Sequence, residues 1–272
     1  MENKQNLHIH STWSDGKNTT REIIEEAIAR GFDSIGFSEH SYMYFRHISQ
    51  QLYISDMEPY KQEVRRLKEE YKDKIDIFCG LEFEYHSRTP QEGFDYVIGS
   101  LHYLDFDGQI LGFDRKLDEM QEYLRVHFGN DGMAFAKRYY EDLCRLPEKG
   151  KFDILGHFDL LTKNNEQGRF IDTTDPAYLR MGMDAIHALK GEIPLFEVNT
   201  GAISRGYRST PYPQMEFVKE FRECGFGAVI SSDCHSKEYL DANFEDARLL
   251  LQEAGFTSRW IFTDHGFEEV AL

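Results

Sequence analysis

The sequence predicts an α/β fold, a barrel of parallel strands with metal-binding side chains gathered at one rim. Strand and helix signals alternate along the whole chain, and its 272 residues match the length that such a barrel needs. An open, doubly wound sheet is the alternative for the same alternation. Acidic or imidazole side chains follow the predicted strands, and a barrel would bring them to one rim: His8, His10, Asp15, His40, Glu82, His102, His157, Glu197, Asp233 and His235.

The first predicted strand covers residues 7–10, and an amphipathic helix follows it. Thr19 and Glu22 have the spacing of a capping box at the start of this helix. The helix ends at Gly31, since glycine readily adopts the left-handed conformation of a helix stop. The next strand covers residues 34–38. The same order of helix, glycine, phenylalanine and strand returns at residues 225–226 and 255–256.

The rest of the chain repeats this alternation. Further strands are expected at residues 75–83, 96–102, 152–156, 195–199 and 228–232, with a last one at 260–263 before a short tail. Helices are expected at residues 58–71, 119–146, 176–189, 213–224 and 244–254, and the Gly-Asn-Asp-Gly sequence at 129–132 splits the second of these in two. No linker or change in composition interrupts the pattern, so we expect one domain over residues 1–272.

Strand parity predicts what faces the barrel interior, because residues two apart in a strand share a face. If the metal-type side chains point inward, their neighbours on the same face are small or polar: Gly36, Ser38, Gly80, Ser100 and Ser231. The opposite face carries Leu7, Ile9, Ile35, Phe37, Val97, Leu101 and Ile230. Ordinary barrel interiors are filled by Val, Ile and Leu. The pattern therefore predicts room for ions and water near the strand ends.

Composition excludes several classes of protein. A formal charge of −17 disfavours a protein that binds a nucleic-acid backbone, although bound metals still allow a phosphorylated small molecule. No apolar run approaches a membrane span, and residues 1–6 contain no apolar signal core. The four cysteines lie far apart, without the spacing of a disulfide framework. We expect a cytoplasmic protein of reduced cysteines, and the oligomeric state is not readable.

Each candidate ligand has an ordinary alternative role when it is considered alone. The His8-Ile9-His10 pair is a weak metal signal, Asp15 before Gly16 is typical of a turn, and a single histidine such as His40 usually packs. Glu82 and Glu84 both face inward by strand parity, and a buried carboxylate without a partner is costly, so it needs a cation. Occurrence at successive strand ends favours a shared metal cluster. The remaining histidines scatter, and we expect surface or packing roles for them: His47, His86, His127, His187 and His265.

The ordered set of motifs resembles the PHP (polymerase and histidinol phosphatase) family over nearly the whole chain. The matching segments are residues 7–12, 14–16, 37–40, 80–82, 100–102, 156–159 and 232–235. The resemblance implies a distorted seven-stranded (β/α) barrel with three metals at the carboxyl rim of the strands. The implied ligands are His8, His10, Glu82 and Asp233 for the first ion, Glu82, His102 and His157 for the second, and Asp15, His40 and His235 for the third.

Within the family, the length, the absence of a polymerase domain and the segment 197–201 look most like the stand-alone histidinol-phosphate phosphatases. The expected activity is hydrolysis of L-histidinol phosphate to L-histidinol and phosphate, in histidine biosynthesis. A water bridging two ions has a pKa near neutrality and supplies hydroxide as the nucleophile, so no phosphoenzyme is needed. We expect catalytic roles for Asp233, which would orient that hydroxide or relay its proton, and for Glu82 and His235.

Loops after the strands are expected to hold the rest of the substrate. Arg205 is the first choice for a phosphate contact, because a guanidinium fork fits phosphate oxygens; a solvated loop arginine is the alternative. Tyr42 opens an aromatic loop that would line an imidazole-sized pocket or pack at the barrel mouth. The other candidates for substrate contacts are Lys163, Arg169, Glu197, Asn199 and Arg208.

Three other functions remain open at this point. The first is a PHP phosphoesterase that acts on nucleotides or nucleic-acid ends. The second is a non-catalytic metal-binding module, which the filled ligand set disfavours. The third is an amidohydrolase-type barrel, disfavoured because no lysine stands at the end of the fourth strand. The mixed imidazole and carboxylate ligands accept Zn²⁺, Mn²⁺ or Fe²⁺.

Overall fold

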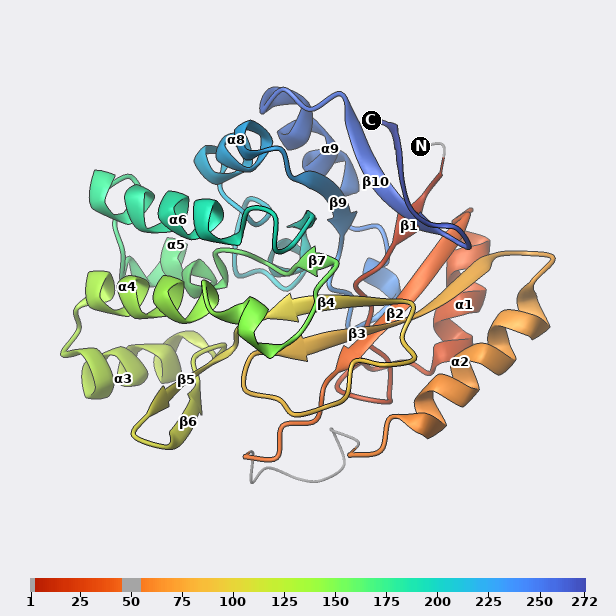
Figure 1. Ribbon diagram of the computed structural model, residues 1–272, viewed down its shortest axis with the longest axis horizontal. Coiled ribbons are helices and arrows are strands. Elements are labelled where there is room, and N and C mark those ends of the chain that lie inside the picture. The colour runs from red at the N-terminus through yellow and green to blue at the C-terminus, as the bar shows by residue number, and fades with distance from the viewer. Residues whose placement is uncertain (1–2, 46–54) are drawn as a thin grey trace.

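A computed structural model describes residues 3–45 and 55–272. Its main sheet has seven parallel strands in the order β1-β2-β3-β4-β7-β8-β9 (Figure 1). These strands are Gln5–Asn6 (β1), Ser34–His40 (β2), Asp76–Glu84 (β3), Tyr96–Ser100 (β4), Ile154–Leu155 (β7), Leu195–Asn199 (β8) and Gly227–Ser231 (β9). The order follows the chain without the reversal that defines a doubly wound sheet. The open-sheet alternative is therefore wrong.

The barrel closes between its first and last strands. Ile9 and Cys234 form a parallel bridge just beyond β1 and β9. The amide of His10 donates to the carbonyl of Cys234 at 2.8 Å, and the amide of Cys234 donates to the carbonyl of His8 at 3.1 Å. The prediction of a distorted seven-stranded barrel is confirmed. The first strand lies earlier than expected, at residues 5–6, and residues 7–10 contribute this closing bridge instead of a regular strand.

Helices cover the outside of the barrel (Figure 1). The capping box is present, with Thr19 as N-cap of the first helix and the Glu22 carboxylate accepting from the Thr19 amide at 2.8 Å. The long 119–146 segment is split as expected, at Gly129. The helices are Thr20–Ala29 (α1), Glu58–Tyr71 (α2), Leu117–Phe128 (α3), Gly132–Leu143 (α4), Asn165–Gly168 (α5), Pro176–Leu189 (α6), Gly201–Ser204 (α7), Met215–Cys224 (α8) and Phe244–Glu253 (α9).

In β3, β8 and β9 the inward face runs from apolar at the amino end to polar at the carboxyl end. Phe78 precedes Gly80 and Glu82, Leu195 precedes Glu197, and Val229 precedes Ser231 on the same faces. The apolar ends meet in a small core inside the barrel: Leu7, Phe78, Tyr96, Ile98, Ile154, Leu195 and Val229. Leu7 thus packs inside and not against the helices, because the chain leaves regular strand geometry after Asn6.

Tyr96 fills the space that the small residues leave. A Cβ on Gly36 would lie 2.3 Å from the Tyr96 hydroxyl, and a Cβ on Gly80 would lie 2.3 Å from its ring. The phenol also donates to the carbonyl of Leu7 at 2.5 Å. Gly36 and Gly80 do face inward, but the expectation that they leave room for ions and water is wrong. That room belongs to the layer above, at the strand ends.

A carboxyl-terminal hairpin closes the amino end of the barrel. Strand β10 (Ser258–Thr263) pairs antiparallel with β11 (Gly266–Ala271), so the expected short tail is a strand. The side chains of Trp260, Phe262 and Phe267 pack against the small core inside the barrel. Gln5 fixes the hairpin to β1, since its amide donates to the carbonyl of Phe262 at 2.7 Å and accepts from the Phe262 amide at 2.7 Å.

A second hairpin was not predicted from the sequence. It follows β4 and consists of β5 (Tyr103–Phe106) and β6 (Gln109–Gly112). Its turn has Asp107 and Gly108 at positive φ, a conformation that an Asp-Gly pair favours.

In the described part of the chain, no helix has both the length and the apolar composition needed to cross a bilayer.

Candidate metal centre

The nine predicted metal ligands lie together at the carboxyl rim of the barrel. Seven are buried, and only Asp15 and His235 keep about a quarter of their side-chain surface exposed, at 29% and 25%. They come from six strand ends: His8, His10 and Asp15 after β1, His40 from β2, Glu82 from β3, His102 after β4, His157 after β7, and Asp233 and His235 after β9. The barrel thus brings residues far apart in the chain into one cluster.

Glu82 lies at the centre of this cluster. One carboxylate oxygen, Oε1, is 3.0 Å from Nε2 of His157, 3.4 Å from Nε2 of His102 and 3.5 Å from Nε2 of His8. The other oxygen, Oε2, is 2.7 Å from Nδ1 of His40 and 3.4 Å from Nε2 of His10. A carboxylate with imidazoles at both oxygens has the arrangement of a ligand that bridges two ions.

Asp233 and Asp15 complete the two sides of the cluster. Oδ1 of Asp233 lies 3.7 Å from Nε2 of His8 and 3.4 Å from Nε2 of His10. On the more open side, the Asp15 carboxylate is 3.4 Å from Nε2 of His40 and 3.3 Å from Nε2 of His235. These distances give three groups of side chains that are close enough to bind metal ions: His10, Asp15, His40 and His235; His8, His10 and Asp233; and His8, Glu82 and His157.

The donor atoms fit a metal. Nε2 of His8 and Nε2 of His10 are fully buried and make no hydrogen bond among the described residues. An unpaired buried nitrogen carries a cost of about 1–3 kcal/mol unless something binds it. Both nitrogens point at the same carboxylates, and mixed nitrogen and oxygen donors suit Zn²⁺ and similar ions. The arrangement therefore fits divalent metals.

Electrostatics keep the carboxylates ionised. Burial favours the neutral acid of Glu82, but His40, His8 and His102 outweigh it and hold the pKa of Glu82 well below its usual value. Asp233 behaves alike, since Arg205 and His8 outweigh its burial and lower its pKa. Burial, together with His235 and His40, lowers the pKa of His10 to about 3, so this imidazole is neutral. Burial favours neutral imidazoles at His8 and His40, but the neighbouring carboxylates outweigh it and raise the pKa of both well above the usual value, so a cation that binds here displaces their protons.

Comparison with known proteins identifies the family to which this chain belongs. The model of the PHP domain matches residues 6–200. This chain belongs to the PHP domain family. A histidinol-phosphatase of Lactococcus lactis is 36% identical over 269 residues, covering 93% of this chain and 92% of the relative. A histidinol-phosphatase of Bacillus subtilis is 30% identical over 254 residues, covering 85% of this chain and 93% of the relative.

The fold agrees with that of a solved PHP-family phosphatase. The crystal structure of histidinol phosphate phosphatase from Lactococcus lactis, complexed with zinc, L-histidinol and phosphate, superposes with a TM-score of 0.72. It is 22% identical, and the match covers 98% of this chain and 99% of that structure. The described chain therefore has the barrel of that PHP protein over almost its whole length.

Glu197 supports the PHP ligand cluster from behind. Oε2 lies 2.9 Å from Nδ1 of His8, and Oε1 accepts from the amide of His157 at 2.6 Å and from Asn199 at 2.9 Å. Ser231 also donates to Glu197. Both oxygens are thus engaged by protein donors, so the geometry gives Glu197 and Asn199 positioning roles in place of the expected substrate contacts. The sequence signal for this role was that strand parity turns Glu197 inward on β8, which is separated from β1 and His8 by the single strand β9.

Two more carboxylates position ligands: Glu84, which strand parity placed inward beside Glu82, and Glu39, for which the sequence predicted no role. Glu84 accepts from Nδ1 and from the amide of His102, at 2.9 and 2.8 Å. Glu39 accepts from the amide and hydroxyl of Ser11, at 2.9 and 2.6 Å, and from Ser14. Burial raises the pKa of Glu39 to about 6, against the effect of these hydrogen bonds. Glu39 thereby fixes the turn that carries Asp15.

Arg205 reaches the edge of the cluster from α7 in the loop after β8. Its Nη2 donates to Oδ2 of Asp233 at 2.9 Å, and its Nη1 donates to the carbonyl of Asp233 at 3.0 Å. The side chain keeps 27% of its surface exposed. Asp233 itself has a φ of 46°, a strained conformation for a residue with a side chain, and Arg205 helps to hold it. This arginine is therefore a built part of the PHP site and not a solvated loop residue.

The other expected substrate residues lie at different places. Lys163 pairs with Asp114 at 2.5 Å at the mouth of the site. Arg208 is turned inward, 3.5 Å from the carboxylate of Asp159 and over the ring of Tyr212, so it supports the loops. Arg169 is exposed at the end of α5. The amide of Tyr42 donates to Thr89 at 2.8 Å, and residues 46 and 47 of the same loop lie outside the described residues.

The remaining histidines lie outside the cluster. His86 is 3.1 Å from the carbonyl of Tyr103, and His127 packs against Phe106 with ring centroids 4.5 Å apart. His265 is exposed in the turn between β10 and β11. His187 is a surface residue paired with Glu220. His47 lies outside the described residues.

Proposed function

We propose that this protein is a metal-dependent phosphatase that hydrolyses L-histidinol phosphate to L-histidinol and phosphate. The observation that carries the proposal is the complete cluster of nine ligands around Glu82 at the rim of a PHP barrel. Relatives that match this chain over most of their length are histidinol-phosphatases. The proposed substrate is a small phosphate monoester, and the formal charge of −17 disfavours binding of a nucleic-acid backbone.

Three divalent ions, Zn²⁺, Mn²⁺ or Fe²⁺, would occupy the cluster. Glu82 would bridge the first two, because His10 of the first set faces its Oε2 and His157 of the second set faces its Oε1. The family resemblance implies that the ligands would be His8, His10, Glu82 and Asp233 for the first ion, Glu82, His102 and His157 for the second, and Asp15, His40 and His235 for the third. Bound ions of this kind lower the pKa of coordinated water and neutralise the charge of phosphoryl oxygens.

The chain's own residues orient the reactants. Asp233 Oδ1 faces the imidazoles of His8, His10 and His235, so this oxygen orients the attacking water and accepts its proton. Arg205 holds the other oxygen, Oδ2, and its partly exposed guanidinium binds the phosphate from the loop side. Lys163 and Asp114 lie at the mouth, where they would contact the rest of the substrate.

A substrate panel with metal analysis on the same sample tests this function. We expect histidinol phosphate to be the best substrate among phosphate monoesters, with nucleoside monophosphates far slower. Hydrolysis in ¹⁸O-labelled water should place one labelled oxygen in phosphate and none in the alcohol, because water attacks phosphorus directly. Faster turnover of nucleotides would reject the substrate. Label in the alcohol would reject the mechanism.

A further inference from the structure

A second group of possible metal ligands lies at the opposite end of the barrel. It consists of His187 on α6 and of Glu220 and Cys224 on α8. Both helices end at the amino ends of the strands that follow them, β8 and β9. The nine-ligand cluster lies at the carboxyl ends of those strands. The two groups are therefore separate sites.

The three side chains converge on one space. Nε2 of His187 is 2.6 Å from Oε1 of Glu220, and Sγ of Cys224 is 3.8 Å from the same oxygen. All three donor atoms lie within 4.8 Å of one another. Glu220 and Cys224 are four residues apart on α8 and so share a helix face, which is turned toward α6. The His187 side chain is 57% exposed, so an ion reaches the group from solvent and the imidazole is free to adjust.

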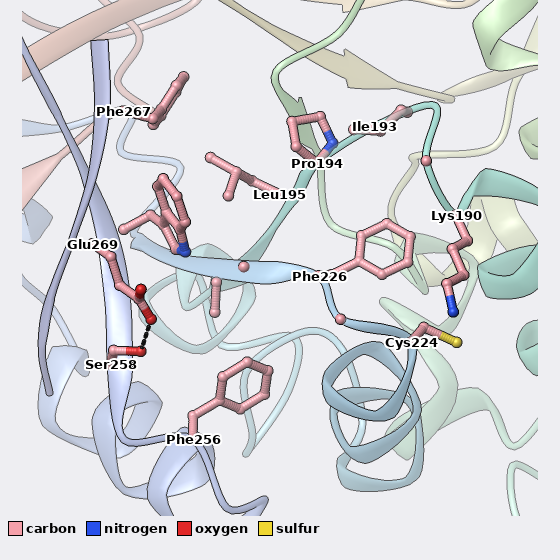
Figure 2. Close-up of a pocket in the computed structure, with 15 residues that line it drawn as sticks. Lys190, Ile193, Pro194, Leu195, Cys224, Phe226, Phe256, Ser258, Phe267 and Glu269 are labelled. Atoms are coloured by element: carbon pink, nitrogen blue, oxygen red, sulfur yellow. Dashed lines mark hydrogen bonds between the residues drawn. The ribbon is translucent and has the colours of Figure 1, made fainter. Parts of the chain in front are cut away.

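The site borders a cavity of about 760 Å³ between the starts of β8 and β9 and the terminal hairpin. Figure 2 shows the sulfur of Cys224 and the ammonium of Lys190 at the same margin of this cavity. The sulfur is therefore not sealed in the protein core. Burial and the neighbouring Glu220 raise the pKa of the Cys224 thiol, whereas Lys190 lowers it. A metal that binds here displaces the thiol proton.

We propose that His187, Glu220 and Cys224 form a second, peripheral site for a Zn²⁺-type ion. One imidazole nitrogen, one carboxylate oxygen and one thiolate sulfur are the donors that Zn²⁺ accepts, and water takes the fourth position. The carboxylate and thiolate together balance the charge of a divalent ion. Bound metal links the end of α6 to the end of α8, so its role is to hold these two helices together beside the cavity.

Cobalt spectroscopy isolates this site from the nine-ligand cluster. A cysteine thiolate bound to Co²⁺ gives a near-ultraviolet charge-transfer band, and the cluster contains no cysteine ligand. Cys234, beside Asp233, donates its thiol to the carbonyl of Ser236 and is 1% exposed. The whole protein, freed of metal and titrated with Co²⁺, should develop the band. Zn²⁺ should then bleach it by displacing Co²⁺, because zinc is well suited to thiolate ligands.

Three variants complete the test. Cys224→Ser should abolish the band while hydrolysis of histidinol phosphate stays within about twofold of wild type. His187→Gln should weaken Co²⁺ binding at this site at least tenfold. Cys144→Ser is the matched control, because Cys144 is also partly buried near a helix end. Among the described residues, Cys144 belongs to no group of possible metal ligands, so this variant should keep the band.

The proposal is overturned if wild-type protein shows no thiolate band, or if the band survives in Cys224→Ser. Unchanged Co²⁺ affinity in His187→Gln overturns the three-ligand site even when Cys224→Ser loses the band. Circular dichroism on each variant checks the fold. Because His187 is largely exposed, its variant tests the site even if Cys224→Ser misfolds.

Discussion

At the scale of single residues, the central position belongs to Glu82. Its two oxygens face different sets of imidazoles, so under the proposed three-ion arrangement its removal would take a ligand from two ions at once. Glu82→Ala should lose at least the two ions that it bridges, and its phosphatase activity with them. Metal analysis of purified protein by mass spectrometry measures the loss. A Glu82→Ala protein with the wild-type number of ions would contradict the bridging role.

A substitution at Glu197 tests whether residues that hydrogen-bond to the candidate ligands affect how tightly those ligands bind metal. Its carboxylate fixes Nδ1 of His8, leaving Nε2 to face Glu82 and Asp233. Glu197→Gln removes the charge and keeps the size, so metal affinity or kcat/KM should fall about 10- to 100-fold. Competition with a chelator measures the affinity. Asn199→Ala is the matched control, because Asn199 touches Glu197 and not His8. Equal loss in both variants would argue for a merely structural effect.

Arg205 tests the contact with phosphate. Arg205→Ala should reduce kcat/KM about tenfold to a hundredfold, since a charge-assisted hydrogen bond contributes about 1.5–3 kcal/mol. Metal content should stay unchanged, because the variant removes a cation, not a ligand, from the side of Asp233. Arg205→Lys should recover only part of the activity, as lysine lacks the fork. Wild-type kinetics in Arg205→Ala would exclude the contact.

At the scale of elements, local signals predicted most of the barrel. Thr19 with Glu22 marked the start of α1, and Gly31, Gly225 and Gly255 marked the helix stops with the positive φ that the structure has. These signals depend on residues close in sequence. The positions of the nine candidate ligands after predicted strands also indicated that they lie together, because parallel strands place all their carboxyl ends at one rim.

The features that could not be predicted from the sequence depend on contacts between segments that are distant along the chain. The ring of Tyr96 enters the space beside Gly36 and Gly80, which come from two other strands. The roles of Glu39 and Glu84 follow from which side chains fold against them; Glu39 lies within the matching segment 37–40, but that segment by itself does not indicate its role. Strand β11 lacks an alternating apolar pattern, and only its pairing with β10 defines it.

The contact between Gly36 and Tyr96 gives a prediction for β2. Gly36→Ala places a methyl group 2.3 Å from the Tyr96 hydroxyl, a distance that forces a shift in the barrel interior. Overpacking of this kind should lower the free energy of unfolding by about 1–3 kcal/mol. Denaturant melts measure it. Adding Tyr96→Phe should recover part of the loss, because that change removes the hydroxyl. Strictly additive losses in the double variant would show that the two positions do not touch.

At the scale of the whole molecule, the two ends of the barrel have different tasks. The amino end is closed by apolar packing of the β10–β11 hairpin, and the carboxyl end gathers ionised and imidazole groups. Without metal, the polar end keeps unpaired donors such as Nε2 of His8 and His10. We therefore expect packing at the amino end to stabilise the fold by itself, and the polar cluster to add stability when ions fill it.

Metal removal should thus destabilise the entire fold. Ligands come from six of the seven barrel strands, so bound ions tie those strands together. An ion at a hundredfold excess over its Kd stabilises the native state by about 2.7 kcal/mol, and 1 kcal/mol moves the Tm of a chain this long by about 2–4 °C. Chelation should therefore lower the Tm by about 5–10 °C for each site that is emptied.

Two variants separate this effect from general destabilisation. Phe262→Ala, at the hairpin, should lower the Tm of the metal-loaded and metal-free protein alike, because Phe262 packs only at the amino end. Glu82→Ala should lower mainly the Tm of protein supplied with metal, and chelation should then shift this Tm less than in wild type, because fewer ions remain to be removed. Calorimetry of the three proteins, with metal and with chelator, gives the comparison. A chelation shift in Glu82→Ala as large as in wild type would mean that the metals stabilise the protein from a site other than this cluster.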